Sequence, residues 1–321
     1  MTTLSAARER WHSSWGSAAV TTMLFLIVCL SWGTTWLGIK IAVETVPPIT
    51  SAGLRFLIAF PLFLSFAWLR GDPILFPKGM SSFFIFVTLF YFCVPYWLLN
   101  YGEQYVSSGL TALIFSTMPV FILVLSAFLL EERVLVSQLI GMTVGCIGLA
   151  LIINSQGEQL DYTRFLGVLA ILVAAGMHAL AYVITKRVGG NIGVVTFNAL
   201  PIAIAGVFMT AAGVVIEHPH LTAISSRSLL ALMYLGLVAS VGGFIVYFFL
   251  LKRMSPIILS FVFIIFPVFA VVIGAWYEGL PMASDFLLNM AVVLGGFAVT
   301  KFPIEPLLRK ATKGTRHDRA E

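Results

Sequence analysis

Ten apolar runs follow one another along this chain, and each is about as long as the hydrocarbon core of a membrane is thick. A bilayer core of ~30 Å needs ~20 mostly apolar helical residues to cross it. The runs are continuous rather than alternating, so they predict helices and not the strands of a barrel. The predicted spans are Val20–Ile41, Ile49–Leu69, Ser81–Tyr101, Ser107–Leu130, Leu135–Ile153, Phe165–Ile184, Val194–Ile216, Leu229–Leu251, Pro256–Tyr277 and Phe286–Phe302.

The composition agrees with a chain whose main solvent is lipid. Hydrophobic residues make up 60% of the 321 residues and charged residues only 10%, whereas soluble domains are about one quarter charged. This excludes a cytosolic enzyme, a secreted disulfide scaffold, a disordered protein and a nucleic-acid binder. Cys29, Cys93 and Cys146 lie inside apolar runs without a CxxC pair or a histidine cluster, so we expect no disulfide, no metal site and no cofactor.

The positive charges orient the predicted spans. Lysine and arginine stay mainly on the cytoplasmic side of a membrane protein. With the N-terminus inside, 15 of the 19 Lys and Arg residues fall on the cytoplasmic side. Lys40, Arg164 and Arg227 fall outside, and Arg55 lies within a span. We therefore expect ten crossings with both termini cytoplasmic, in a plasma membrane of the bacterial inner-membrane type.

The chain also resembles itself at an offset of 148 residues. Met118–Phe121 and Phe266–Phe269 both carry a Pro-Val-Phe sequence at this offset, and Gly148 falls on Gly296. Five spans per copy is an odd number, so the second copy would be inverted in the membrane, an arrangement that recurs in transporters with a binding site near the midplane. The predicted fold is all-α, with two inverted five-helix repeats around a central cavity. The expected segments are a tail at 1–19, repeats at 20–154 and 164–303, and a tail at 304–321.

Three motifs carry a resemblance to a known family. The first span contains Ser-Trp-Gly-Thr-Thr-Trp at 31–36, and the second contains Gly-Leu-Arg-Phe at 53–56. A turn at 106–112 leads into a fourth span with Pro119 that ends in Glu131 and Glu132. Together with the ten spans, these motifs resemble the EamA-type branch of the drug/metabolite transporter superfamily. In the second half only Glu278 corresponds to the paired glutamates, one position out of register.

Polar and amphipathic side chains at mid-depth are the candidate cavity residues, because lipid-facing positions favour purely apolar side chains. Trp32 lies ~18 Å along the helix from Val20, too deep for the interfacial aromatic belt. The aromatic rings among the candidate residues could line a cavity and stack on a flat ligand, or they could pack between helices. The candidates are Trp32, Thr35, Trp36, Tyr91, Tyr96, Trp97, Asn100, Tyr101, His178, Tyr182, Phe244, Tyr247 and Phe263.

Three polar candidates each leave a functional and a structural role open. Asn100 could bind a zwitterion, or it could join helices as asparagine often does in membranes. His178 could bind substrate or a proton, or it could be a neutral imidazole bonded to a neighbour. Arg55 could attract a carboxylate or pair with Glu44 in an outer gate, or it could anchor the span by reaching toward the interface.

Backbone features complete the set of candidate residues. Pro95, Pro119 and Pro267 are predicted to kink their helices, because proline removes a helical hydrogen bond. Gly141, Gly145 and Gly148 form a small-residue face that favours scaffold packing and leaves a homodimer open beside a monomer.

These features favour a transporter over an enzyme, a channel or a receptor. The sequence has no HExxH or GxSxG motif. The family resemblance extends to exporters of aromatic amino acids, which implies outward movement of Phe, Tyr, Trp and Met by alternating access. With Glu44 and Glu103 at span edges, no carboxylate is expected deep in a span, which favours facilitative transport. The alternative is export of a purine or drug-like compound with proton coupling through His178.

Overall fold

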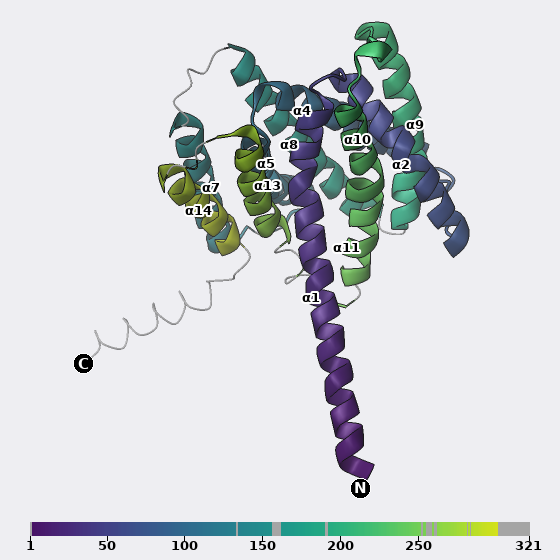
Figure 1. Ribbon diagram of the computed structural model, residues 1–321, viewed down its shortest axis with the longest axis vertical. Helices are drawn as coiled ribbons and strands as arrows, with labels where there is room; N and C mark the ends of the chain where they lie inside the picture. Colours follow the sequence, from purple (N-terminus) through teal and green to yellow (C-terminus); the bar gives the residue numbers. More distant parts are fainter. Residues whose placement is uncertain are drawn as a thin grey trace, which may run out of the picture.

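The computed structural model describes residues 2–132, 134–155, 162–189, 192–251, 253–254, 259, 262–280, 282 and 284–300. All regular secondary structure in these residues is helical (Figure 1). The first part of the chain forms α1 (Thr2–Ala42), α2 (Pro48–Arg70), α3 (Ser81–Val87), η1 (Thr88–Cys93), α4 (Val94–Tyr105), α5 (Ser108–Phe115), α6 (Met118–Leu129) and α7 (Val136–Ser155). The second part forms α8 (Tyr162–Val188), α9 (Val194–Ile216), η2 (Leu221–Ala223), α10 (Ser226–Tyr234), η3 (Leu235–Gly242), α11 (Gly243–Leu251), α13 (Val262–Glu278) and α14 (Ser284–Val299).

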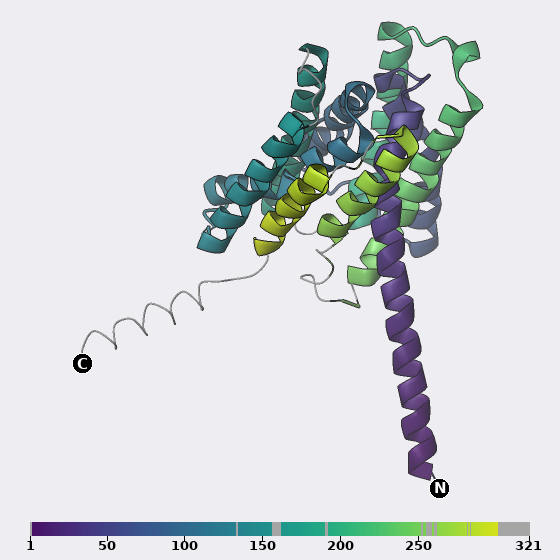
Figure 2. The same cartoon turned by 60° about the vertical axis from the view of Figure 1, so that its left-hand side comes forward.

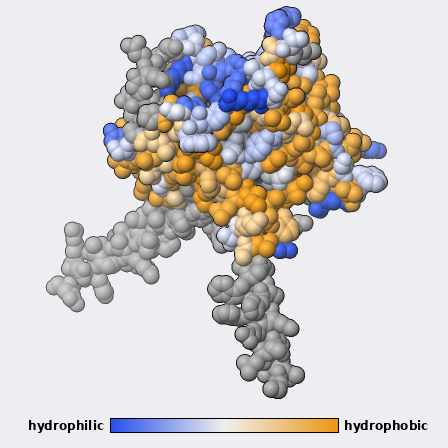
Figure 3. Space-filling view, in the orientation of Figure 1, coloured by the Kyte–Doolittle hydropathy of each residue, from blue (hydrophilic) through white to orange (hydrophobic). Residues whose placement is uncertain are grey.

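The helices have the length and apolarity of membrane spans. Among the described residues, seven helical segments are long and apolar enough to cross a membrane, and three further apolar helices are shorter. Large hydrophobic side chains cover the sides of the bundle, and hydrophilic residues gather mainly toward one end (Figure 3). The expectation of an all-helical membrane protein is therefore confirmed.

Each predicted span overlaps observed helix, and most helices extend past the predicted bounds by a few residues or more. The shorter helices, Val136–Ile152, Ile265–Glu278 and Ser284–Val299, lie in the fifth, ninth and tenth predicted spans. Ten crossings therefore remain a prediction. The predicted tail at 1–19 is continuous with the first span, because α1 is helical from Thr2 onward. The predicted tail at 304–321 lies outside the described residues.

Neighbouring helices in the bundle come from distant parts of the chain. α2 packs along α9, α7 along α14, α4 along α8, and α1 along α13 (Figures 1 and 2). These pairings bring the first and second parts of the chain together. Any space enclosed between them is consequently lined by both parts.

Two helical segments depart from α geometry near the middle of the bundle. Thr88–Cys93 and Leu235–Gly242 are both π-helical. Such wide turns interrupt the regular hydrogen-bond ladder and often occur at functional sites. Pro95 follows the first of them, at the start of α4.

The other two predicted kinks differ from each other. Pro119 lies at the start of α6, directly after an interruption at Ser116 and Thr117 that separates α5 from α6. Proline favours this position because the first turn of a helix needs no N–H donor from it. Pro267 lies inside α13, which continues through it as one helix.

The small-residue face of α7 is covered within the chain. A Cβ atom placed on Gly296 of α14 would lie 2.5 Å from the backbone nitrogen of Gly145 and 2.7 Å from the carbonyl oxygen of Gly141. The side chain of Val293 similarly fills the space over Gly148. Glycine is required here because the two backbones touch, and scaffold packing accounts for the glycine face.

This contact predicts a difference between two adjacent glycines. Gly296→Ala forces α7 and α14 apart, and we expect it to lower the free energy of unfolding by ~1–3 kcal/mol, as overpacking does. Gly295→Ala meets nothing within 4 Å and should change it by less than ~0.5 kcal/mol. Thermal unfolding in detergent measures both. Equal stability of the two variants would contradict the close contact.

Candidate functional site

A cavity of about 130 Å³ lies at the centre of the bundle, where α1, α2, α4, α8 and α13 converge. Its walls are mostly aromatic, with a few polar groups among them. Nine predicted cavity residues and Arg55 line it: Trp32, Thr35, Trp36, Tyr91, Tyr96, His178, Tyr182, Phe244, Phe263 and Arg55. The sequence prediction missed Ile39, Leu99, Phe115, Met118, Ala239 and Phe266.

Two tryptophans of α1 organise the aromatic walls. Trp32 has its ring centroid 5.8 Å from that of Phe263 and is stacked on Tyr247 at 5.1 Å. Trp36 lies one turn further along, 5.0 Å from Phe115 and 6.2 Å from Phe266. Such contacts fix the rings at low conformational cost and leave flat apolar surface facing the cavity.

His178 projects from α8 into a ring of aromatic edges. Its ring centroid lies 4.9 Å from Tyr91, 5.5 Å from Tyr96 and 5.4 Å from Phe115. Its Nδ1 is 2.9 Å from the carbonyl oxygen of Ala174. A carbonyl can only accept, so Nδ1 carries the proton, and in a neutral ring Nε2 is the acceptor. The side chain is 5% exposed and offers the cavity one acceptor within an apolar wall.

Arg55 is the charged group of the cavity. It is 4% exposed, its Nε donates to Ser240 Oγ at 3.1 Å, and its guanidinium carbon lies 5.1 Å from the ring centroid of Tyr96. Its buried Nη1 has no hydrogen-bond partner among the described residues. A buried donor without an acceptor is costly, especially on a charged group, so an acceptor brought by a ligand would be strongly favoured here.

The structure corrects the predicted surroundings of Arg55. The side chain is buried and does not reach the interface as an anchor would. It also makes no ion pair with Glu44 among the described residues. The Glu44 carboxylate lies instead 4.0 Å from the guanidinium of Arg227.

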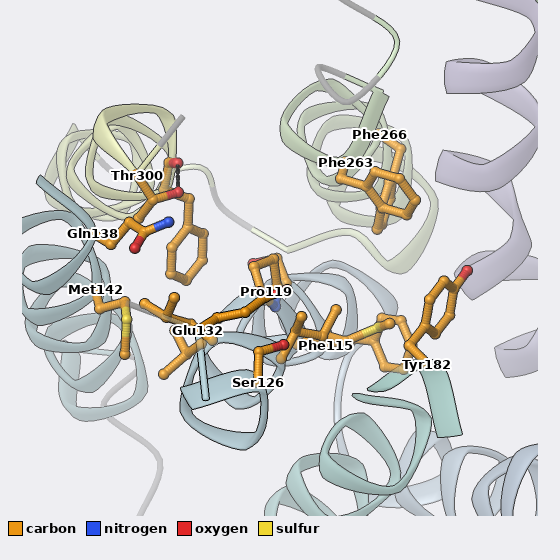
Figure 4. A pocket seen from close by; sticks show the side chains of 16 residues that line it. Phe115, Pro119, Ser126, Glu132, Gln138, Met142, Tyr182, Phe263, Phe266 and Thr300 are labelled. Atoms are coloured by element: carbon orange, nitrogen blue, oxygen red, sulfur yellow. Dashed lines mark hydrogen bonds between the residues drawn. The ribbon is translucent and has the colours of Figure 1, made fainter. Parts of the chain in front are cut away.

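A wider cavity of about 440 Å³ adjoins the central one. Gln138 and Met142 of α7 lie on one side of it, and Phe263 and Phe266 of α13 lie on the other (Figure 4). The two cavities share five residues: Phe115, Met118, Tyr182, Phe263 and Phe266. The wider cavity is also lined by Glu132, an exposed residue that forms an ion pair with Lys186. The centre of the bundle therefore connects toward this end of the molecule.

Four predicted residues do not line the central cavity. Trp97 is an exposed residue, Tyr101 packs against Tyr105 at 5.2 Å, and Tyr247 lies behind Trp32. Asn100 is buried between α2 and α4, where its Oδ1 accepts from Ser51 Oγ at 2.8 Å. Its Nδ2 donates to the carbonyl oxygen of Tyr96 at 2.8 Å. Of the two roles open to Asn100, the geometry favours joining helices.

The internal repeat could have identified two of the missed residues. Met118 and Phe266 each precede the proline of the repeated motif, and both line the two cavities. The remaining missed residues are ordinary apolar side chains, which the sequence does not distinguish from core residues.

Glu103 lies at a span edge, as expected, but the packing of the helices buries its side chain. It lies in the last turn of α4 and is 0% exposed. Neither carboxylate oxygen has a hydrogen-bond partner among the described residues. Its position near the end of an apolar run indicated an interface, but the packing of neighbouring helices buries it.

Comparison with known proteins identifies the family. The sequence model of the EamA-like transporter family matches residues 20–154 and again residues 165–301. The chain belongs to the EamA-like transporter family. Membership of this family, within the drug/metabolite transporter superfamily, confirms the expected membrane transporter and excludes the enzyme alternative.

Several relatives span nearly the whole chain. Protein PagO of Salmonella typhimurium is 39% identical over 276 residues, which cover 86% of this chain and 91% of PagO. An uncharacterized transporter of Buchnera aphidicola subsp. Schizaphis graminum is 41% identical over 248 residues, covering 77% and 83% of the two chains. The uncharacterized inner membrane transporter YedA of Escherichia coli K12 is 31% identical over 289 residues, covering 86% and 90%.

A protein of known crystal structure shares the fold. It superposes with a TM-score of 0.64 at 18% sequence identity, covering 88% of this chain and 96% of its own. This likeness supports the arrangement of the helices and not a particular substrate.

The role of Asn100 in joining helices predicts coupling with Ser51. Asn100→Ala and Ser51→Ala each remove the same hydrogen bond, so the double variant should be less destabilised than the sum of the single variants. We expect a coupling free energy of ~0.6 kcal/mol, the average for hydrogen bonds between membrane helices. Unfolding in detergent of the four proteins measures it. Strictly additive losses would show that the hydrogen bond does not stabilise the bundle.

Proposed function

We propose that this protein exports aromatic and other apolar amino acids across the bacterial plasma membrane by alternating access. The observation that carries the proposal is the central cavity, whose mostly aromatic wall includes Arg55, a residue whose Nη1 has no hydrogen-bond partner among the described residues. Flat rings stack favourably on such walls. A substrate carboxylate would supply the acceptor that the guanidinium lacks, as a charge-assisted hydrogen bond. An amino acid with an aromatic side chain combines both features.

The direction of transport is supported by the wider cavity. It leads from the central cavity toward Glu132 and Lys186, which lie on the side that the charge distribution predicts to be cytoplasmic. A binding site reached from the cytoplasm fits the loading state of an exporter. Small-molecule substrate and lipid are the partners that this proposal requires, and a single chain encloses the site.

We further propose that the architecture consists of ten spans in two inverted five-helix repeats. The family model matches the chain twice, once in each half. The offset of 148 residues carries the π-helical Thr88–Cys93 onto residues 236–241, within the π-helical Leu235–Gly242. It also carries α2 onto residues 196–218, which overlap its packing partner α9. Corresponding helices that pack on each other are expected around a pseudo-two-fold axis.

A second candidate function is export of another flat compound, such as a purine or a drug-like molecule, with His178 taking part in proton exchange. The aromatic walls support it, because they can stack on any flat ring. The single hydrogen-bond acceptor of His178 supports it as well. A cationic compound would leave Arg55 without an acceptor and place two positive charges together, so the geometry favours a substrate with a carboxylate.

The proposal predicts a role for Arg55 in recognising the carboxylate. In proteoliposomes, we expect counterflow of labelled phenylalanine. Unlabelled phenylalanine should compete at least about tenfold more strongly than phenylalanine amide, because a charge-assisted hydrogen bond to the carboxylate contributes ~1.5–3 kcal/mol. Arg55→Gln should reduce counterflow and abolish the preference for the carboxylate. Tryptophan, methionine, adenine and a lipophilic cation are tested as alternative substrates.

Arg70→Gln is the matched control, because Arg70 forms an exposed pair with Asp72 at 3.0 Å away from the cavity. It should leave counterflow and the preference unchanged. Counterflow of adenine or the cation, with none of phenylalanine, would overturn the amino-acid proposal and favour the second candidate. An unchanged carboxylate preference in Arg55→Gln would show that this side chain does not bind the substrate.

The predicted topology has its own test. Both termini are expected in the cytoplasm, so green fluorescent protein fused after Glu321 should fluoresce and alkaline phosphatase fused there should be inactive. The same pair of fusions placed before Met1 tests the other terminus. Active phosphatase at one terminus alone would require an odd number of crossings and would remove the inverted repeat.

A further inference from the structure

The buried Glu103 follows a residue of the central cavity wall by one turn of α4. Leu99, one helical turn earlier on α4, is part of the cavity wall, as is Ile39 of α1. Lys40, the residue after Ile39, donates from Nζ to the carbonyl oxygens of Glu103 at 2.6 Å and Val106 at 3.0 Å. These bonds tie α1 to the end of α4 and close the bundle on the side opposite Glu132.

The charged neighbours of Glu103 come from two other helices. They are the ammonium group of Lys40 on α1 and the carboxylate of Glu278 on α13. Glu278 is partly buried, and its Oε1 accepts from Ser108 N at 2.9 Å and Ser108 Oγ at 2.5 Å.

α8 packs against α4 at this level with Gly167 and Ile171, which lie against Gly102, and it carries Arg164 about one turn before Gly167. α5 presents Ser108 and Thr111. The nearest charge on α2 is Arg55, which contacts Tyr96, seven residues or ~10 Å of helical rise before Glu103.

An ionised carboxylate is poorly accommodated in this position. Both oxygens of Glu103 lack a hydrogen-bond donor among the described residues. Lys40 gives its donated hydrogen bonds to backbone oxygens and forms no ion pair with the Glu103 carboxylate within the described structure. The nearby ammonium group of Lys40 attracts a negative charge on Glu103, and the carboxylate of Glu278 repels it. Protonating a buried carboxylate that has no partners costs much less free energy than keeping its charge in the protein interior. The carboxyl group of Glu103 therefore holds a proton in this conformation.

We propose that Glu103 is a proton-binding site that couples proton entry to substrate export. The inference rests on the proposed function and deepens it by naming the co-transported ion. When the bundle opens on the Lys40 side, the bonds from Lys40 to the carbonyl oxygens break and water reaches the carboxylate, which accepts a proton from hydronium. Closure buries the neutral acid, and substrate binding in the cavity one turn away releases the proton to water there. Each cycle moves one proton inward for one substrate outward.

The test uses proteoliposomes in which only the proton gradient drives transport. Vesicles with an acidic interior and an alkaline exterior should accumulate labelled phenylalanine above equilibrium, because an antiporter concentrates substrate against outward proton flow in either orientation. Glu103→Gln should abolish this accumulation and retain counterflow at equal pH, since exchange needs no net proton movement. Glu103→Asp should keep accumulation, because it keeps a titratable group. Asp72→Asn, which alters an exposed carboxylate, should behave as the unaltered protein.

A measurement that needs no substrate separates this inference from the proposed function. Infrared difference spectra between the unaltered protein and Glu103→Gln in lipid at neutral pH should show the stretch of a protonated carboxyl group. The inference is overturned if that band is absent, if Glu103→Gln accumulates substrate normally, or if the unaltered protein shows counterflow without pH-driven accumulation. A protonated band without any phenylalanine counterflow would instead reject the substrate proposal and leave the proton site standing.

Discussion

The cost of an unpaired polar group in hydrocarbon is the constraint on which this structure depends. Inside a bilayer each backbone N–H and C=O must find its partner within the protein, and the described residues meet this requirement with helices alone. Departures from regular α geometry also occur within the spans. Thr88–Cys93, Leu235–Gly242 and the interruption at Ser116 and Thr117 all lie where other helices cover them or where a cavity begins.

Close packing of the peripheral helices explains how a cavity persists at the centre of the bundle. α2 and α9 approach closely, with Gly53 against Met209 and Thr210, and α7 approaches α14 at Gly296. These contacts fix the positions of the peripheral helices. The rings of Trp32 and Trp36 can therefore line the central cavity without closing it. Rigid peripheral pairs around an aromatic centre provide the kind of framework in which one part can rock against another.

Much of the fold could be predicted from the sequence because hydrophobic length is a local property. The apolar runs marked the helices, and Pro119 marked a break in the fourth span. Cavity residues were predicted where a polar or aromatic side chain lay too deep for the interface, as with Trp32, Tyr91 and His178. Asn100 followed the same rule and is turned toward Ser51 instead, because the direction of a side chain depends on which helix lies opposite.

Glu103 and Arg55 show most clearly what a linear sequence leaves undetermined. Both lie near the ends of apolar runs, where a charged side chain normally reaches water. In the folded chain neighbouring helices bury both of them, and each keeps polar atoms without hydrogen-bond partners among the described residues. Their surroundings nevertheless differ. Arg55 belongs to the wall of the central cavity, whereas Glu103 is fully buried beside a basic group and an acidic group. A site open to a ligand can be completed by a substrate carboxylate, and a buried carboxylate without partners is neutralised by a proton. Two residues with the same unfavourable burial are therefore suited to two different parts of one transport cycle.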